Sequence, residues 1–142
     1  MPEVRLPDGN AVRASSLADR QTVDSKRDFG LYLDPAWKPD WPAASIDWPD
    51  FGLPAFPQQA YRQIVDAYHH VRSGQRVEVG CLGGLGRTGT VLACFCVLSG
   101  LDAPSAIAWV RSGYDRRAIE TAAQEQWVAW FASQVAEGKR EE

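Results

Sequence analysis

Short runs of apolar residues dominate the first half of the sequence, and their length and spacing predict strands. In residues 3–14 two such runs flank a Pro-Asp-Gly-Asn turn, which is typical of a hairpin. Three further segments have the composition of short strands: 29–33, 44–48 and 76–80. We expect residues 15–28 and 34–43 to be irregular, the first because it is polar and the second because it holds three prolines.

The second half of the chain has the longer periods of helices. Pro57 opens a segment whose apolar residues recur every three or four positions until Ser73 and Gly74. Three further helices are expected, over 88–98, 102–113 and 121–135. The first of these three carries no charge, which indicates a buried helix. Strands followed by a strand–loop–helix unit and then by helices predict a single layered α/β domain over residues 1–142.

The composition restricts the classes of function. A chain of 142 residues with 45% hydrophobic and 23% charged residues fits a globular domain with its own core. The net charge of −3 argues against broad binding to nucleic acid or to an anionic membrane. We expect a cytoplasmic protein, because no apolar stretch is long enough to cross a bilayer and no signal-peptide pattern is present. Three cysteines, an odd number, exclude a complete disulfide framework, and no Cys/His group has the spacing of metal ligands.

A glycine-rich loop joins the predicted strand 76–80 to the uncharged helix. Backbone N–H groups in such a loop, at the N-terminus of a helix, can converge on an anion. The loop of nucleotide hydrolases, Gly-x4-Gly-Lys-Ser/Thr, fits poorly, because it needs a glycine at position 81 and a lysine at position 87. The dinucleotide-binding fingerprint is matched literally by Gly84, Gly86 and Gly89, but no second strand–helix unit follows it.

A third pattern, Cys-x5-Arg-Thr, fits the loop through Cys81, Arg87 and Thr88. Its chemistry is that of phosphoryl transfer to sulfur. Arg87 offers a planar, permanently charged clamp, and its positive field favours a Cys81 thiolate as the nucleophile. The Thr88 hydroxyl can hydrogen-bond that sulfur and help it leave in a second step. The backbone amides expected to surround the phosphate oxygens belong to Leu82, Gly83, Gly84, Leu85, Gly86 and Arg87.

A cysteine nucleophile also needs a general acid, because the leaving oxygen must be protonated. The segment Trp48-Pro-Asp-Phe-Gly-Leu-Pro54 lies upstream of the glycine-rich loop. Its proline and glycine beside an aspartate, bracketed by large aromatic residues, are typical of a hinged loop that can close over a substrate. Asp50 is therefore the candidate general acid.

These motifs together resemble the cysteine-dependent protein-tyrosine and dual-specificity phosphatase superfamily. A third segment, Ala118-Ile-Glu-Thr-Ala-Ala-Gln124, is similar to the stretch that carries the family's water-positioning glutamine. The resemblance implies a central mixed sheet flanked by helices, with the phosphate loop between a strand and a buried helix. It implies a cysteinyl-phosphate on Cys81, Asp50 as acid and then base, and Gln124 as the residue that holds the water, with Gln126 a weaker candidate. It implies no metal and no other cofactor.

The resemblance also implies the partners. The substrate would be a phosphorylated protein or peptide, and the site would bind phosphate, sulfate or vanadate. The short chain is similar to compact dual-specificity members. We expect neither a nucleic acid nor a membrane as a partner, and the loop interior, Leu-Gly-Gly-Leu-Gly, lacks the basic residues of lipid phosphatases.

Two positions depart from the family pattern. Gly80 stands where the family usually has a histidine that orders the loop and tunes the thiolate, and Glu120 stands where tyrosine-specific members often have glutamine. The first departure leaves open a second hypothesis, a phosphate-binding or phosphopeptide-binding module with little catalysis.

Several other residues have a structural and a functional interpretation. Cys94 and Cys96 are expected in the core, with a disulfide to Cys81 as the alternative. The paired arginines 116 and 117 are candidates for a second anion contact, and Trp37 and Trp41 are candidates for aromatic walls of the substrate site.

Overall fold

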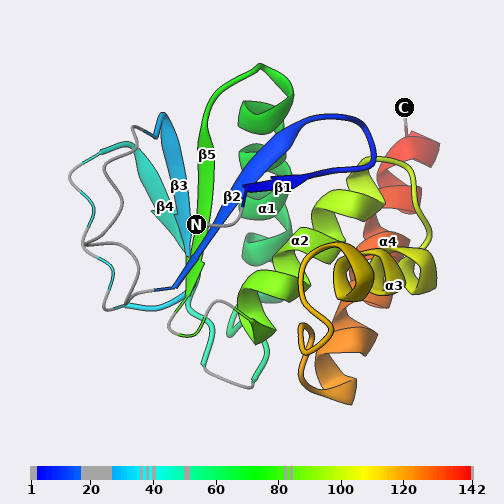
Figure 1. The fold of residues 1–142 in the computed structure, drawn as a ribbon. Coiled ribbons are helices and arrows are strands. Elements are labelled where there is room, and N and C mark those ends of the chain that lie inside the picture. Colours follow the sequence, from blue (N-terminus) through cyan, green and yellow to red (C-terminus); the bar gives the residue numbers. More distant parts are fainter. Residues whose placement is uncertain are drawn as a thin grey trace.

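The computed structural model describes residues 3–16, 27–35, 37, 39, 41–49, 52–81, 83 and 85–141, without the side chains of the last three. Within these residues the chain forms five strands and four helices (Figure 1). The strands are β1 (Glu3–Arg5), β2 (Ala11–Ser16), β3 (Phe29–Tyr32), β4 (Ala43–Ser45) and β5 (Val77–Cys81). The helices are α1 (Pro57–Arg72), α2 (Gly86–Leu98), α3 (Ala103–Gly113) and α4 (Ala122–Glu141).

The strands form one mixed sheet in the order β1-β2-β5-β3-β4. β1 and β2 are antiparallel and form the predicted hairpin, whereas the other three pairs are parallel. β5 lies in the centre, so its carboxyl end is flanked by the carboxyl ends of β2 and β3, with Ser16 opposite Cys81 and Tyr32 opposite Gly80. Ligands of parallel α/β sheets bind beyond this edge.

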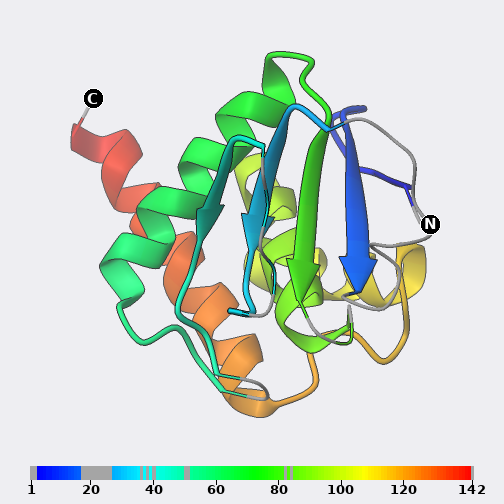
Figure 2. The ribbon, with the colours of Figure 1, turned by 90° about the vertical axis from the view of Figure 1, so that its left-hand side faces the viewer.

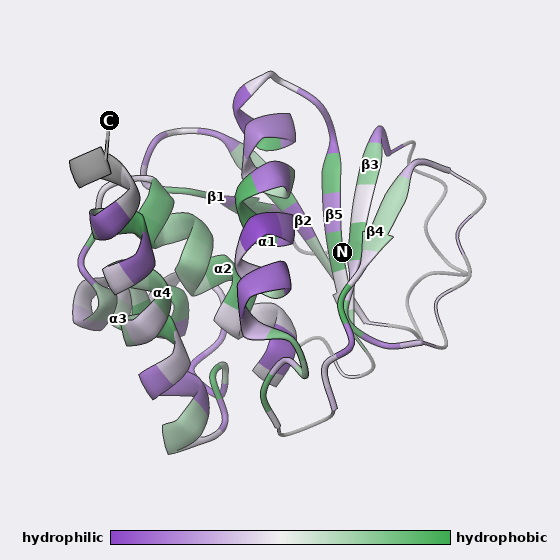
Figure 3. Cartoon of the chain, turned by 180° about the vertical axis from the view of Figure 1, so that it is seen from behind, coloured by the Kyte–Doolittle hydropathy of each residue, from purple (hydrophilic) through white to green (hydrophobic). Residues whose placement is uncertain are grey.

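The four helices pack on one side of the sheet (Figures 1 and 2). α2 lies in the middle of this layer, in contact with α1, α3, α4 and β5, which explains why its sequence is apolar on every face. α1 by contrast turns its apolar face, from Ala60 to Val71, toward the core and keeps polar residues outside (Figure 3). The prediction of an α/β domain with a mixed sheet and a buried helix after the glycine-rich loop is confirmed.

Successive residues of β5 point to opposite faces of the sheet, and this alternation separates two environments. Val77, Val79 and Cys81 join the hydrophobic core on the helix side. Glu78 and Gly80 therefore point to the other face, and both are buried.

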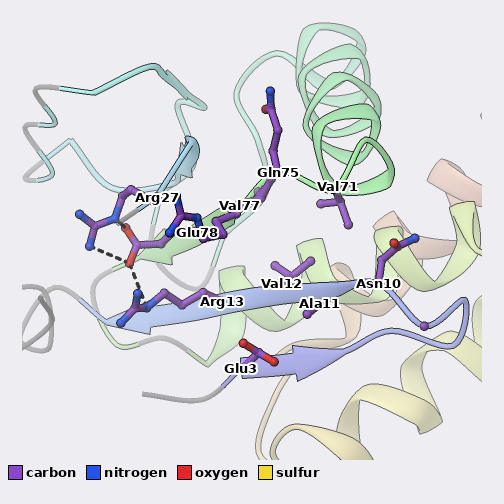
Figure 4. Close-up of a pocket in the computed structure, with 13 residues that line it drawn as sticks. Glu3, Asn10, Ala11, Val12, Arg13, Arg27, Val71, Gln75, Val77 and Glu78 are labelled. Carbon is purple, nitrogen blue, oxygen red and sulfur yellow. Dashed lines mark hydrogen bonds and ion pairs between the residues drawn. The ribbon is translucent and has the colours of Figure 1, made fainter. Parts of the chain in front are cut away.

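Glu78 is the centre of a charged cluster on the sheet face opposite the four described helices (Figure 4). Its carboxylate accepts hydrogen bonds from the hydroxyls of Ser15 and Tyr32, both at 2.6 Å. Nε of Arg27 lies 2.7 Å and Nε of Arg13 lies 3.7 Å from the same carboxylate. The cluster borders a cavity of about 440 Å³ at the amino end of β5, so this cavity is separate from the Cys81 end of the strand.

The observed ends of several elements differ from the predicted ones. The predicted strand 44–48 is shorter, because pairing with β3 ends at Ser45. β2 continues to Ser16, two residues into the stretch predicted to be irregular, because its last residue pairs with Cys81. α2 begins at Gly86, two residues early, and the last helix continues to Glu141. The early start of α2 places Arg87 and Thr88 in its first turn.

In the part of the chain that the structure describes, no helix combines the length and the apolar character needed to cross a bilayer.

Candidate active site

The loop from Cys81 to Thr88, called the 81–88 loop below, joins the end of β5 to the first turn of α2. Cys81 is 2% exposed and Thr88 is fully buried. The Thr88 hydroxyl lies 3.0 Å from the Cys81 sulfur, in position to donate a hydrogen bond to it. This contact is the arrangement expected for a sulfur that must carry negative charge. Two residues of the predicted phosphate-binding set, Leu82 and Gly84, lie outside the described residues.

Arg87, the predicted phosphate clamp, has a buried guanidinium in the same loop. Its Nη1 donates to the carbonyl oxygens of Leu33, at 2.8 Å, and of Trp48, at 2.9 Å. Its Nη2 lies 3.2 Å from Oδ2 of Asp34. The two carbonyls and the Asp34 carboxylate thus fix the guanidinium through both of its terminal nitrogens.

Asp34 is a partner of Arg87 that the sequence interpretation missed. It follows β3 by two residues, at the same carboxyl edge of the sheet as Cys81. An acidic residue directly after a buried parallel strand is a signal that could have identified it. Its carboxylate and the Leu33 carbonyl fix the clamp residue from the β3 side, and the Trp48 carbonyl fixes it from a second segment.

The segment from Trp48 to Pro54, called the 48–54 segment below, lies against Arg87 through the Trp48 carbonyl. The candidate acid Asp50 lies outside the described residues, as does Phe51. Hydrogen bonds connect the described residues of the segment that precede and follow Asp50. Trp48 is buried against Trp127 and donates from Nε1 to the Gly52 carbonyl at 2.8 Å, and the Gly52 amide donates to the Pro49 carbonyl at 2.9 Å. These bonds constrain the residues on both sides of Asp50.

Gln124 lies in the first turn of α4 and faces the 48–54 segment. Its side chain is fully buried, its Oε1 accepts from the Glu120 amide at 2.8 Å, and its Nε2 donates to the Gly52 carbonyl at 3.3 Å. The weaker candidate, Gln126, is exposed and lines a cavity between α3 and α4. The structure therefore brings Gln124, and not Gln126, to the segment that carries Asp50.

The segment before α4 packs against the first turn of α2. Ile119 has a φ of 60°, which for a β-branched residue costs about 1–3 kcal/mol and occurs where the surroundings impose it. Arg111 imposes it here, because Nη2 donates to the Ile119 carbonyl at 2.8 Å and Nε donates to the Ala118 carbonyl at 3.2 Å. The consequence is that the Glu120 carboxylate lies against Gly86, where a methyl group would overlap it. No sequence pattern predicted this strained turn.

The other two cysteines are buried in α2, and none of the three cysteines forms a disulfide with another. Burial raises the pKa of the Cys96 thiol to about 12 and raises the pKa of the Cys94 thiol well above its usual value. Both stay neutral at physiological pH and act as small core residues. No disulfide to Cys81 is formed.

Three further candidates from the sequence are Arg116, Arg117 and Trp37. Arg117 forms an ion pair with Asp115 at 3.1 Å, whereas Arg116 is exposed. Trp37 is buried and packs on Gly80, so it is not a wall open to substrate. Among the described residues, no group of three or more His, Cys, Asp or Glu side chains is placed to hold a metal ion.

Comparisons with known proteins agree with this geometry. Residues 55–137 match the family model described as PTP-SAK, the Swiss Army Knife protein, DSP-PTPase phosphatase domain. An uncharacterised protein of Methanocaldococcus jannaschii is 37% identical over 109 residues, which cover 69% of this chain and 71% of that protein. Among solved structures, Tk-PTP in its active form has a TM-score of 0.74 at 25% identity, with 94% of this chain and 98% of that chain covered.

PTPMT1 is also similar, with a TM-score of 0.74 and coverage of 99% of this chain and 100% of the other. At 13% identity this likeness concerns the fold alone. The family match includes α1, β5, the 81–88 loop, α2, α3 and most of α4, which are the elements that surround Cys81 and Arg87. The chain therefore belongs to the DSP-PTPase phosphatase family, as a compact member similar to dual-specificity phosphatases.

Proposed function

We propose that the protein hydrolyses phosphomonoesters on a phosphorylated protein or peptide, with phosphotyrosine as a substrate and phosphoserine or phosphothreonine as further ones. The observation that carries the proposal is the contact between the Thr88 hydroxyl and the Cys81 sulfur, at 3.0 Å, in a loop whose Arg87 is held by two other segments of the chain. A loop that served only as a connection would need neither a buried arginine nor a hydroxyl directed at a thiol.

In the first step the Cys81 sulfur attacks phosphorus, and the bond between phosphorus and the substrate oxygen breaks. The loop amides from Leu82 to Arg87 and the Arg87 guanidinium bind the phosphate oxygens. Asp50 gives its proton to the departing oxygen. The products of this step are the dephosphorylated hydroxyl group and a cysteinyl-phosphate.

In the second step a water molecule attacks the cysteinyl-phosphate. Asp50, now a carboxylate, takes the proton from this water, and Gln124 positions the water beside it. The bond between phosphorus and sulfur breaks, and the Thr88 hydroxyl stabilises the sulfur as it becomes a thiolate again. Inorganic phosphate leaves, and both Cys81 and Asp50 return to their starting protonation states.

The direct test is phosphate release from p-nitrophenyl phosphate and from phosphotyrosyl, phosphoseryl and phosphothreonyl peptides by the purified full chain. We expect release from the phosphotyrosyl peptide, inhibition by vanadate and no dependence on added metal. A folded protein that binds the phosphopeptides without releasing phosphate would replace this proposal with the binding module.

Asp50→Asn tests the general acid. We expect it to lower kcat/KM by about 10²–10⁴-fold for substrates with poor leaving groups, because these need the proton most, and much less for p-nitrophenyl phosphate. The measurement is kcat/KM for a series of aryl phosphates with leaving groups of different pKa. An equal loss for every leaving group would remove Asp50 from the acid role.

Thr88→Val tests the second step. Valine keeps the shape of threonine but removes the hydroxyl 3.0 Å from the Cys81 sulfur, so we expect kcat to fall about tenfold and a burst of p-nitrophenol to precede slow turnover. Thr90→Val is the matched control, because the Thr90 hydroxyl donates to the Gly86 carbonyl, within its own helix. Equal kinetics in the two variants would contradict the role given to Thr88.

A further inference from the structure

The side-chain position of Gly80, directly before Cys81, is occupied by the indole ring of Trp37. A Cβ atom at residue 80 would lie 2.7 Å from Cζ2 of Trp37 and 3.1 Å from Cδ1 of Tyr32. Residue 80 does not have a positive φ, so its backbone conformation does not call for glycine. The requirement for glycine comes from the ring that covers it.

The same indole contacts the backbone of the candidate nucleophile. Nε1 of Trp37 donates a hydrogen bond to the carbonyl oxygen of Cys81 at 3.3 Å, in a buried environment. This carbonyl belongs to the first peptide of the 81–88 loop. A hydrogen bond from the indole to this carbonyl fixes the plane of the peptide. It also offsets the negative end of the carbonyl dipole close to the sulfur, and this favours the thiolate.

A buried network holds Trp37 in place. Its ring stacks on Tyr32 with centroids 4.5 Å apart and 19° between the planes. The Tyr32 hydroxyl donates to Glu78 at 2.6 Å and accepts from Nε1 of Trp41 at 2.9 Å. Burial, together with Glu78, raises the pKa of Tyr32 well above its usual value, so Tyr32 remains a neutral donor at any physiological pH.

We propose that Trp37 is a positioning residue for the nucleophile, which orders the start of the 81–88 loop and favours the Cys81 thiolate from the sheet face opposite the helices. In this role the indole, supplied by the segment after β3, occupies the place that a side chain at residue 80 would fill. At Gly80, where the family usually has a histidine that orders the loop, the indole of Trp37 then provides that support instead. The inference rests on the proposed function of Cys81, but the state of the thiol can be measured without turnover.

Trp37→Phe is the first test, because phenylalanine keeps an aromatic ring on Tyr32 and removes the N–H donor. We expect the midpoint of the pH dependence of Cys81 alkylation by iodoacetamide to move to higher pH, and the alkylation rate at neutral pH to fall about 3- to 10-fold. The kcat for p-nitrophenyl phosphate should fall by a similar factor. Trp109→Phe, in a partly buried indole of α3, is the matched control and should change neither quantity.

Gly80→Ala is the second test, because its methyl group would displace the indole without changing Trp37 itself. We expect the same direction of change in alkylation and kcat. The same methyl group should change alkylation and kcat less in the Trp37→Phe background, because phenylalanine lacks the indole carbon that the methyl group would overlap. Wild-type alkylation behaviour in both single variants, with their circular dichroism unchanged, would overturn the inference.

The two proposals fail in different ways. If the wild-type protein releases no phosphate but Trp37→Phe shifts the alkylation midpoint, the proposed hydrolysis is wrong and the support of Cys81 by Trp37 stands. If the wild-type protein is an active phosphatase and Trp37→Phe leaves both the midpoint and kcat unchanged, the support is wrong and the hydrolysis stands.

Discussion

Cys81→Ser is expected to abolish phosphate release, with a loss of about four orders of magnitude or more in kcat. A serine hydroxyl is not ionised at neutral pH, so it is a far weaker nucleophile than a thiolate at the same position. Because the loop amides and Arg87 are unchanged, the variant should still bind phosphopeptide. The measurement is phosphopeptide hydrolysis together with binding by fluorescence polarisation.

Cys96→Ser is the matched control for this substitution. It makes the same change in a thiol that is buried within α2 and neutral, so turnover should be close to that of the wild-type protein at temperatures where the variant is folded. Persistent turnover in Cys81→Ser would contradict the assignment of the nucleophile. A loss of turnover in both variants would show that removal of a buried thiol, and not of a nucleophile, stops turnover.

Glu78→Ala is expected to lower the free energy of unfolding by about 3–5 kcal/mol. Glu78 is fully buried at the centre of the sheet and accepts hydrogen bonds from two hydroxyls. Its removal leaves Arg27 and Arg13, with side chains 12% and 17% exposed, as uncompensated charges at the same place. It also releases Tyr32, on which Trp37 stacks. Urea denaturation followed by circular dichroism measures the change.

Glu125→Ala is the control for the loss of an ion pair. The Arg111–Glu125 pair has a distance of 3.4 Å, but its side chains are 36% and 41% exposed, so the same substitution should cost less than about 1 kcal/mol. If Glu78→Ala costs no more than Glu125→Ala, the cluster at Glu78 does not stabilise the fold as we infer.

The part of the site that could be predicted from the sequence is the part whose residues lie close together in the chain. Cys81, Arg87 and Thr88 lie in one loop that ends in the first turn of α2, so a spacing pattern was enough to make them candidates. The buried helix and the strand before it followed from an uncharged apolar run and from glycine punctuation. These local signals fixed the α/β class as well.

The supports of the site could not be predicted in the same way, because they depend on contacts between distant residues. Asp34 meets Arg87 across 53 positions, and Trp37 reaches the Cys81 carbonyl across 44. Only the order of strands in the sheet, with β3 beside β5, brings these segments together. Gly80 was predictable as a departure from the family, whereas its cause, the overlying indole, was visible only in three dimensions.

Trapping the intermediate shows whether Cys81 carries the phosphoryl group during turnover. The full chain, mixed rapidly with p-nitrophenyl phosphate and quenched in acid, is digested and its peptides are analysed by mass spectrometry. We expect the mass of one phosphoryl group on the peptide that contains Cys81. The phosphorylated fraction of this peptide should be larger in Thr88→Val and zero in Cys81→Ser. Phosphorylation of a different residue, or rapid turnover with no phosphoryl group on Cys81 even in Thr88→Val, would contradict it.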